Sequence, residues 1–203
     1  FASRFCVEEF VGRVRESKGK TIITMIERAV RETNEQLILQ AKNNPNLDGM
    51  GTTFVMASVL EDRILVANIG DSRLYIIDSE MEQITMDHSL VAEMVRNGDI
   101  NEEAARIHPN KNIVTRALST NGVVVPDFFE VPRKDNMAIL LCSDGLFSMV
   151  DNEEIVTIVK ENKGNPEMAC KTLVHRANEN GGKDNISVVL VYLNEAETEN
   201  EHD

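Results

Sequence analysis

Three aspartates stand where an apolar run meets a turn: Asp71, Asp144 and Asp184. Taken singly, each fits ordinary turn chemistry, because Asp and Gly are common turn formers. Asp144 follows one strongly apolar run and Asp184 precedes another, so both carboxylates emerge at one end of a sheet if those strands are antiparallel neighbours. Two carboxylates at such a short distance raise each other's pKa unless a cation neutralises their charge. Oxygen ligands without nearby His or Cys favour Mg²⁺ or Mn²⁺.

The elements that must position these aspartates alternate between helical and strand patterns. Apolar residues at helical spacing predict helices over 7–14 and 22–37, the second ending at 43–45. Short β-branched runs predict strands at 53–60, 63–69, 74–77, 128–131, 137–143 and 186–193. The last run is almost uninterrupted, which predicts a strand buried on both faces at the centre of a layered structure.

Polar signals mark where the remaining helices begin. Ser89 and Asn101 are expected to cap short helices inside a polar, insertion-like segment at about 87–119. Asp151 with Glu154 predicts a capping box, and Asn165 precedes a helix stopped by the glycines at 181–182. Helices flank the strands at both ends of the chain, and hairpins join adjacent strands. This favours an α+β layered sandwich with two mainly antiparallel sheets over a parallel doubly wound sheet.

Composition limits the function classes. The 203 residues suit one domain, expected over 1–194, followed by an acidic, disordered tail at 195–203. Hydrophobic residues make up 42% and there is no Trp, so an aliphatic core is expected. The net charge of −13 repels phosphate backbones, which argues against a nucleic-acid partner. An acidic protein that acts on phosphate esters would need metal cations to invert the local field.

Cysteine usage and the chain start predict a cytoplasmic protein that does not interact with membranes. Cys6, Cys142 and Cys170 are widely spaced and odd in number, so reduced, buried thiols are expected rather than disulfides or a thiolate metal site. No apolar run is long enough to span a bilayer, and residues 1–5 lack the zones of a signal peptide. The four histidines show no ligand spacing, and we expect surface or capping roles for them.

Five short motifs follow one another along the chain. In order they are Gly-Met-Gly-Thr-Thr at 49–53, Ala-Asn-Ile-Gly-Asp-Ser-Arg at 67–73, Thr-Arg-Ala-Leu at 115–118, Cys-Ser-Asp-Gly-Leu at 142–146 and Asp-Asn-Ile-Ser at 184–187. Together they resemble the motifs of the bacterial type of the protein phosphatase 2C family, a family of metal-dependent serine/threonine phosphatases. Residues 89–109 are similar to the flap region of bacterial members. Each motif alone is weak, but five in the family's order are specific, and they cover nearly the whole chain except its tail.

The resemblance implies roles for individual residues. Asp144 and Asp184 match carboxylates of a two-metal centre for Mn²⁺ or Mg²⁺, and Asp71 matches the acidic residue of a third, weaker metal site. Asn185 is expected to orient the carboxylate of Asp184 without binding the metal itself. Gly145, in the same motif as Asp144, is expected to be another supporting residue beside the metal ligands.

Two interpretations remain open for each of four other residues in the family-like motifs. Thr52 and Thr53 lie where hydroxyls could bond to ligands or bound water, although β-propensity alone explains them equally well. Arg116 either positions a phosphopeptide or forms a structural ion pair. Arg73 either pairs with a carboxylate near the centre or has no such role.

The implied reaction is hydrolysis of phosphoserine and phosphothreonine in proteins by a metal-activated water, without a phosphoenzyme and without a nucleophilic side chain. Cys142 lies in an apolar run and is expected in the core. The implied partners are phosphoprotein substrates in bacterial signalling, where such members commonly oppose a serine/threonine kinase. We expect a monomer.

The chain departs from the family pattern at its start. Family members open with a strand carrying a phosphate-binding Arg, an acidic element, and a turn whose Asp bridges both metals. Residues 2–5 resemble the helix that follows that turn, so these N-terminal strands are expected to be absent here. Asp48 only superficially imitates the bridging residue, because the spacing that follows assigns it to the later motif. The alternative function is therefore a non-catalytic fragment or pseudophosphatase that binds a phosphoprotein or regulator.

Overall fold

The computed structural model describes residues 1–17, 21–119 and 124–193, which fold into two compact units. The first unit comprises Phe1–Met56, Ala67–Ser72 and Met86–Phe128, and the second comprises Ala57–Val66, Arg73–Thr85 and Phe129–Asp203. The acidic tail predicted at 195–203 lies outside the described residues. Among the described residues, no helix is both long and apolar enough to cross a membrane.

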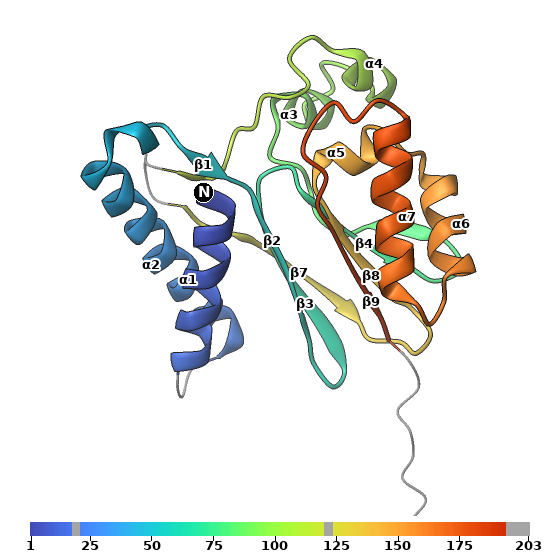
Figure 1. The fold of residues 1–203 in the computed structure, drawn as a ribbon, viewed down its shortest axis with the longest axis horizontal. Coiled ribbons are helices and arrows are strands. Elements are labelled where there is room, and N and C mark those ends of the chain that lie inside the picture. Colours follow the sequence, from blue (N-terminus) through green and yellow to red (C-terminus); the bar gives the residue numbers. More distant parts are fainter. Residues whose placement is uncertain (18–20, 120–123, 194–203) are drawn as a thin grey trace, which may run out of the picture. The chain divides into compact units, whose positions relative to one another are not determined.

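An antiparallel helix pair builds the core of the first unit (Figure 1). The pair consists of α1, Ala2–Glu16, and α2, Ile22–Asn43. Buried side chains recur along α2 every three or four residues, as expected for a helix with one apolar face: Ile26, Ala29, Val30, Thr33, Asn34, Leu37 and Ala41. The ring of Phe10 on α1 meets that of Phe54 edge-on at 4.8 Å. The second predicted helix is confirmed, including its end before Pro45.

Shorter elements complete the first unit. They are η1 (Pro45–Leu47), the paired strands β1 (Gly51–Thr52) and β6 (Leu118–Ser119), and the helices α3 (Leu90–Arg96) and α4 (Glu102–Ile107). Both predicted caps are confirmed, because the Ser89 hydroxyl accepts a hydrogen bond from the backbone N–H of Ala92 and the Asn101 side chain accepts one from Ala104. The strands β2 (Phe54–Val59), β3 (Arg63–Ile69) and β7 (Asp127–Pro132) form a sheet in the order β2-β3-β7 and contribute residues to both units.

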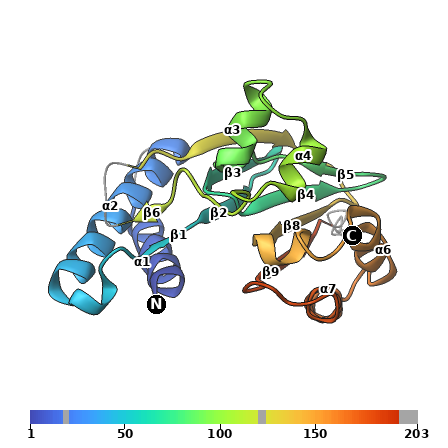
Figure 2. The same cartoon turned by 90° about the horizontal axis from the view of Figure 1, so that it is seen from above.

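The second unit is built on a four-stranded sheet with the order β5-β4-β8-β9, in which every neighbouring pair is antiparallel. Its strands are β4 (Arg73–Ile77), β5 (Met81–Gln83), β8 (Ala138–Cys142) and β9 (Val188–Tyr192). The helices are α5 (Asp144–Phe147), α6 (Asn152–Glu161) and α7 (Pro166–Glu179). Figure 2 shows α6 and α7 together on one face of this sheet.

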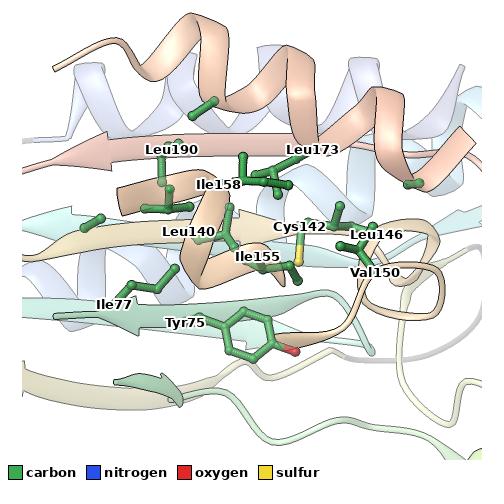
Figure 3. Packing of buried hydrophobic residues seen from close by; sticks show 14 residues of the cluster. Tyr75, Ile77, Leu140, Cys142, Leu146, Val150, Ile155, Ile158, Leu173 and Leu190 are labelled. Carbon is green, nitrogen blue, oxygen red and sulfur yellow. The ribbon is translucent and has the colours of Figure 1, made fainter. Parts of the chain in front are cut away.

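Alternate side chains of the strands fill the space beneath α6 and α7 (Figure 3). Tyr75, Leu140 and Leu190 occupy opposed positions on three adjacent strands and point toward the helices. Ile155 and Leu173 meet them from α6 and α7 and are fully buried. Side chains of opposed register on one face of a sheet pack as a unit, which makes this cluster the support for the loops at the ends of β8 and β9.

Two element-level predictions are wrong. The strand predicted at 186–193 was expected to be buried on both faces, but Val189 and Val191 of β9 are 56% and 40% exposed, and within the described residues β9 is an edge strand. The predicted capping box at α6 does not form, because the Asp151 side chain makes no cap hydrogen bond. Glu154 instead accepts a hydrogen bond from Arg176 at 2.6 Å, so an ion pair between two helices replaces the local cap. The predicted α+β class with antiparallel sheets and helix pairs is confirmed.

Candidate metal centre

The register of β8 and β9 brings two of the predicted aspartates to one end of a sheet. The strands are antiparallel, and Cys142 lies opposite Val188. Asp144 follows Cys142 by two residues and Asp184 precedes Val188 by four, so both leave the sheet at the same edge (Figure 1). The sequence argument required the two strands to be antiparallel neighbours, and β8 and β9 are.

Ser143 ties the two loops together at this edge. Its hydroxyl donates to the carbonyl oxygen of Asn185 at 2.9 Å and accepts from the backbone N–H of Ser187 at 3.0 Å. Its own backbone N–H donates to the Ser187 carbonyl at 3.1 Å. The sequence reasoning missed Ser143, although a hydroxyl directly before the aspartate was a usable signal.

Gly145 allows a close approach between the same two loops. A Cβ atom on Gly145 would lie 2.5 Å from the carbonyl oxygen of Asn185. The predicted orienting contact of Asn185 is made by its backbone, since its N–H donates to Asp184 Oδ1 at 2.7 Å. The Asp184 carboxylate is thus held by the loop that Ser143 and Gly145 position.

Electrostatics distinguish the two carboxylates. Burial raises the pKa of Asp144, and the neighbouring charge of Asp184 raises it further, against a smaller lowering by backbone N–H groups and Arg73. Arg73 lies over the ring of Phe147, with its guanidinium carbon 3.6 Å from the ring centre, and donates to the Tyr75 hydroxyl at 3.0 Å. Asp144 is half-buried, whereas Asp184 is exposed. The arrangement leaves a half-buried carboxyl beside a like charge, and a divalent cation would relieve that repulsion.

The donor set fits a hard cation, though it is small. Asp144 and Asp184 supply carboxylate oxygens, the ligands that Mg²⁺ and Mn²⁺ prefer. Within residues 1–17, 21–119 and 124–193, no group of three or more His, Cys, Asp or Glu side chains converges. The second unit therefore provides a pair of carboxylates.

Asp71 belongs to the first unit, so its convergence with Asp144 and Asp184 stays a prediction. Gly70, directly before it, has φ of +110°, and a Cβ atom there would collide with the side chain of Thr53. Ser72, directly after it, shares a hydrogen bond of 2.7 Å with the Thr53 hydroxyl. Thr53 therefore braces the Asp71 turn from both sides.

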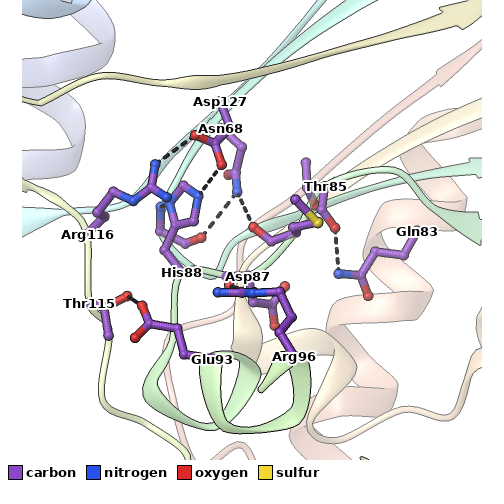
Figure 4. A network of polar contacts seen from close by, with 12 residues as sticks. Asn68, Gln83, Thr85, Asp87, His88, Glu93, Arg96, Thr115, Arg116 and Asp127 are labelled. Atoms are coloured by element: carbon purple, nitrogen blue, oxygen red, sulfur yellow. Dashed lines mark hydrogen bonds and ion pairs between the residues drawn. The ribbon is translucent and has the colours of Figure 1, made fainter. Parts of the chain in front are cut away.

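Arg116 and Thr52 make other contacts. Arg116 donates to Asp127 Oδ1 at 2.7 Å, which favours the structural ion pair of its two interpretations (Figure 4). The Thr52 hydroxyl donates to the carbonyl oxygen of Thr53 at 3.1 Å.

The expectation of a surface or capping role is wrong for His88, which is 2% exposed and hydrogen-bonded through both ring nitrogens. Its partner across the turn, Asp127, lies 39 residues away in sequence, so spacing along the chain carried no signal.

Comparisons with known proteins agree with this fold. The sequence matches the family model described as protein phosphatase 2C over residues 10–186. It is 42% identical over 177 residues to serine/threonine phosphatase stp of Listeria innocua, covering 87% of this chain and 70% of that protein. The structure of the serine/threonine phosphatase Stp1 from Staphylococcus aureus is similar, with a TM-score of 0.86, 34% identity, and coverage of 94% and 76%.

A second solved structure is the catalytic domain of the serine/threonine phosphatase PstP in complex with 2 manganese ions. It is similar to this chain with a TM-score of 0.79 and 31% identity, covering 93% of this chain and 79% of that one. The family match spans most of the sequence, and the fold and the order of the motifs agree with it. The chain belongs to the protein phosphatase 2C family.

Proposed function

We propose that this protein hydrolyses phosphoserine and phosphothreonine in proteins with the help of Mn²⁺ or Mg²⁺. The observation that carries the proposal is the Asp144–Asp184 pair at the shared end of β8 and β9, in a chain of the protein phosphatase 2C family. Homologues named as serine/threonine phosphatases support the activity, and the manganese-bound PstP domain supports the choice of metal.

The proposed role of each residue follows from where it lies in the structure. Asp144 and Asp184 would hold the cations, and Asp71 would contribute to a third, weaker site. When bound, the cations neutralise phosphoryl charge and activate water for in-line attack. Ser143 and Gly145 hold the Asp184 loop against β8, and the Asn185 backbone orients the Asp184 carboxylate.

The first unit supplies the supporting hydroxyls. Thr53 braces the turn that carries Asp71, and Thr52 bonds to Thr53. Arg116, which is exposed, would position a phosphopeptide only if it left Asp127.

The setting of this activity is also part of the proposal. The substrates would be phosphoproteins in bacterial signalling, where the protein would oppose a serine/threonine kinase, and it would act as a monomer. A single phosphatase domain would span 1–194, with the flap at about 87–119. The odd number and wide spacing of Cys6, Cys142 and Cys170 support a reducing, cytoplasmic location.

Calorimetric titration of Mn²⁺ into the 203-residue chain, beside hydrolysis of a phosphothreonine peptide, tests the proposal. Asp144→Asn and Asp184→Asn should each weaken Mn²⁺ binding at least about tenfold and abolish hydrolysis. Asp135→Asn is the matched control, because Asp135 is exposed and precedes the same strand that Asp144 follows. It should leave both measurements unchanged.

Two other results would count against the proposal. Mn²⁺ binding that neither Asp144→Asn nor Asp184→Asn weakens would show that the cation site is elsewhere. Tight binding of the phosphothreonine peptide without hydrolysis at saturating Mn²⁺ would instead support the non-catalytic, phosphoprotein-binding alternative.

A further inference from the structure

His88, which Figure 4 shows bonded to Asp127, holds the turn before Asp71 from two directions. The backbone N–H of His88 donates to the carbonyl oxygen of Gly70 at 3.0 Å, and the N–H of Gly70 donates back to His88 Nδ1 at 3.0 Å. Asn68 Nδ2 adds a bond of 3.2 Å to the same carbonyl. Both polar groups of the Gly70 backbone are therefore bound by side chains or backbone that lie in the first unit.

These contacts determine which ring nitrogen of His88 carries the proton. Nδ1 accepts a hydrogen bond from Gly70, so it has no hydrogen of its own. The proton then lies on Nε2, which donates to Asp127 Oδ2 at 2.9 Å. An imidazolium would direct an Nδ1–H at the Gly70 N–H, two donors facing each other in a buried site. The ring is therefore neutral, as the Nε2–H tautomer.

Asp127 is itself oriented by a second partner. Arg116 donates to Asp127 Oδ1 at 2.7 Å while His88 occupies Oδ2. Burial tends to raise the pKa of Asp127, but the hydrogen bonds from His88 and Arg116 outweigh it and lower that pKa overall. A carboxylate that stays ionised is a strong acceptor, so it fixes the orientation of the His88 ring.

The same histidine links the two ends of the segment at 87–119. The carbonyl oxygen of His88 accepts a hydrogen bond from the backbone N–H of Thr115 at 2.8 Å, next to Arg116. Ser89 forms an isolated β-bridge with Val114. His88 thus joins the Asp71 turn, the start of β7 and the far end of its own segment within the first unit.

We propose that His88, as the neutral Nε2–H tautomer held by Asp127 and Arg116, is a positioning residue that fixes the Asp71 turn for cation binding. The inference rests on the proposed role of Asp71 as a metal ligand. His88 acts through the Gly70 backbone, because its hydrogen bonds reach Gly70 and not the Asp71 carboxylate.

Two substitutions separate the two contacts of the ring. In His88→Asn, the amide oxygen takes the place of Nδ1 and can still accept from Gly70, but the bond to Asp127 is lost. In His88→Gln, the amide nitrogen takes the place of Nε2 and can still donate to Asp127, but the acceptor for Gly70 is lost. His175→Asn is the control, since His175 is exposed on α7 in the second unit.

The experiment is an NMR titration with Mg²⁺, which is diamagnetic, following the backbone amides of residues 71 and 184. In the wild-type protein both amides should shift, and ring nitrogen spectra should show the Nε2–H tautomer of His88. His88→Gln should raise the Mg²⁺ concentration that half-saturates the Asp71 shift at least about tenfold, as loss of groups behind metal ligands does. His88→Asn should retain much of the affinity, and the Asp184 response should be unchanged in both.

Three outcomes would overturn the inference. An Nδ1–H tautomer or an imidazolium in the folded wild-type protein would contradict the hydrogen-bond assignment. Wild-type affinity at Asp71 in a folded His88→Gln variant would show that the turn needs no such support. Absence of an Asp71 shift in the wild-type protein would remove the role of Asp71 itself, and loss of the Asp184 shift as well would overturn the proposed function.

Discussion

The carboxyl group of Asp144 is half-buried and lies beside the charge of Asp184, so ionising it in the metal-free protein costs free energy. Arg73 offsets part of that cost, but its guanidinium also stacks on Phe147 and bonds to Tyr75. If position 144 served stability alone, an ionisable carboxyl would be an unfavourable choice for it. The unfavourable placement is what a cation-binding carboxylate requires, because the bound metal removes the repulsion.

Asp144→Asn should therefore stabilise the metal-free protein at neutral pH, while it abolishes stabilisation by Mn²⁺. The pKa of Asp144 is raised on folding, so the folded state binds more protons than the unfolded state between the ordinary value and the raised one. Stability then falls as pH rises through that window, and the gain from the substitution appears above it and vanishes below it. Urea unfolding with a chelator present, across pH 3 to 8, measures this with about ±10–15% uncertainty in each free energy.

The same unfolding series with Asp135→Asn provides the control, since that carboxyl is exposed. A metal-free Asp144→Asn protein that is less stable than wild type at neutral pH would contradict the argument, because it would mean that the ionised carboxylate makes net favourable contacts.

At the residue scale, the sequence predicts the placement of Asp144 and Asp184 at one end of a sheet, because each stands in a turn beside an apolar strand, and the register of β8 and β9 agrees with it. Their role as metal ligands stays a prediction. The support for Asp71 was not identifiable, because His88 and Asp127 meet only through tertiary structure. Buried polar networks of this kind combine residues that no spacing rule connects.

Among the secondary-structure elements, the contact between α5 and the loop before β9 depends on one glycine. Gly145 is the second residue of α5, directly after Asp144, and its Cα faces the backbone of Asn185. The Asn185 carbonyl is also the acceptor for the Ser143 hydroxyl. Any side chain at 145 must displace this carbonyl, and with it the loop that carries Asp184.

Gly145→Ala should destabilise the protein by about 1–3 kcal/mol, the usual cost of overpacking against atoms that cannot move freely. It should also weaken Mn²⁺ binding, because the Asp184 loop must shift. Gly12→Ala is the matched control, since Gly12 lies in α1 with nothing within 4 Å of an added Cβ. That substitution should stabilise the helix by roughly 0.5–1 kcal/mol. Equal unfolding free energies for Gly145→Ala and wild type would show that the loops are not in tight contact.

The strands and helices themselves were largely predictable, since their periodicity is a local property. The strand at 63–69 has the predicted bounds, and the caps at Ser89 and Asn101 follow from short-range hydrogen bonding. The failures involve partners distant in sequence. An apolar run cannot reveal whether its strand has one neighbouring strand or two. A Glu near a helix start cannot reveal that an Arg on another helix will bind it instead of the local backbone.

At the scale of the whole molecule, the three predicted ligands are divided between two units. Asp71 lies in the first unit, and Asp144 and Asp184 lie in the second. The sequence predicts one domain over 1–194, and no signal in it marks where the compact units divide, because contacts between distant segments decide where a compact unit ends. The pairing of Asp144 with Asp184 within the second unit is the part that the structure supplies.

Hydrogen exchange with and without Mn²⁺ can determine whether the three carboxylates share cations. A ligand that binds only the folded state stabilises it, by about 2.7 kcal/mol at a hundred times its dissociation constant. If Asp71 joins the centre through a third, weaker site, Mn²⁺ should slow exchange at residues 143–145 in the second unit at low concentration and at 70–72 in the first unit at higher concentration. Asp71→Asn should then remove the protection at 70–72 and leave that at 143–145, whereas Asp144→Asn should remove both. Protection confined to the second unit, unaffected by Asp71→Asn, would show that Asp71 takes no part in binding.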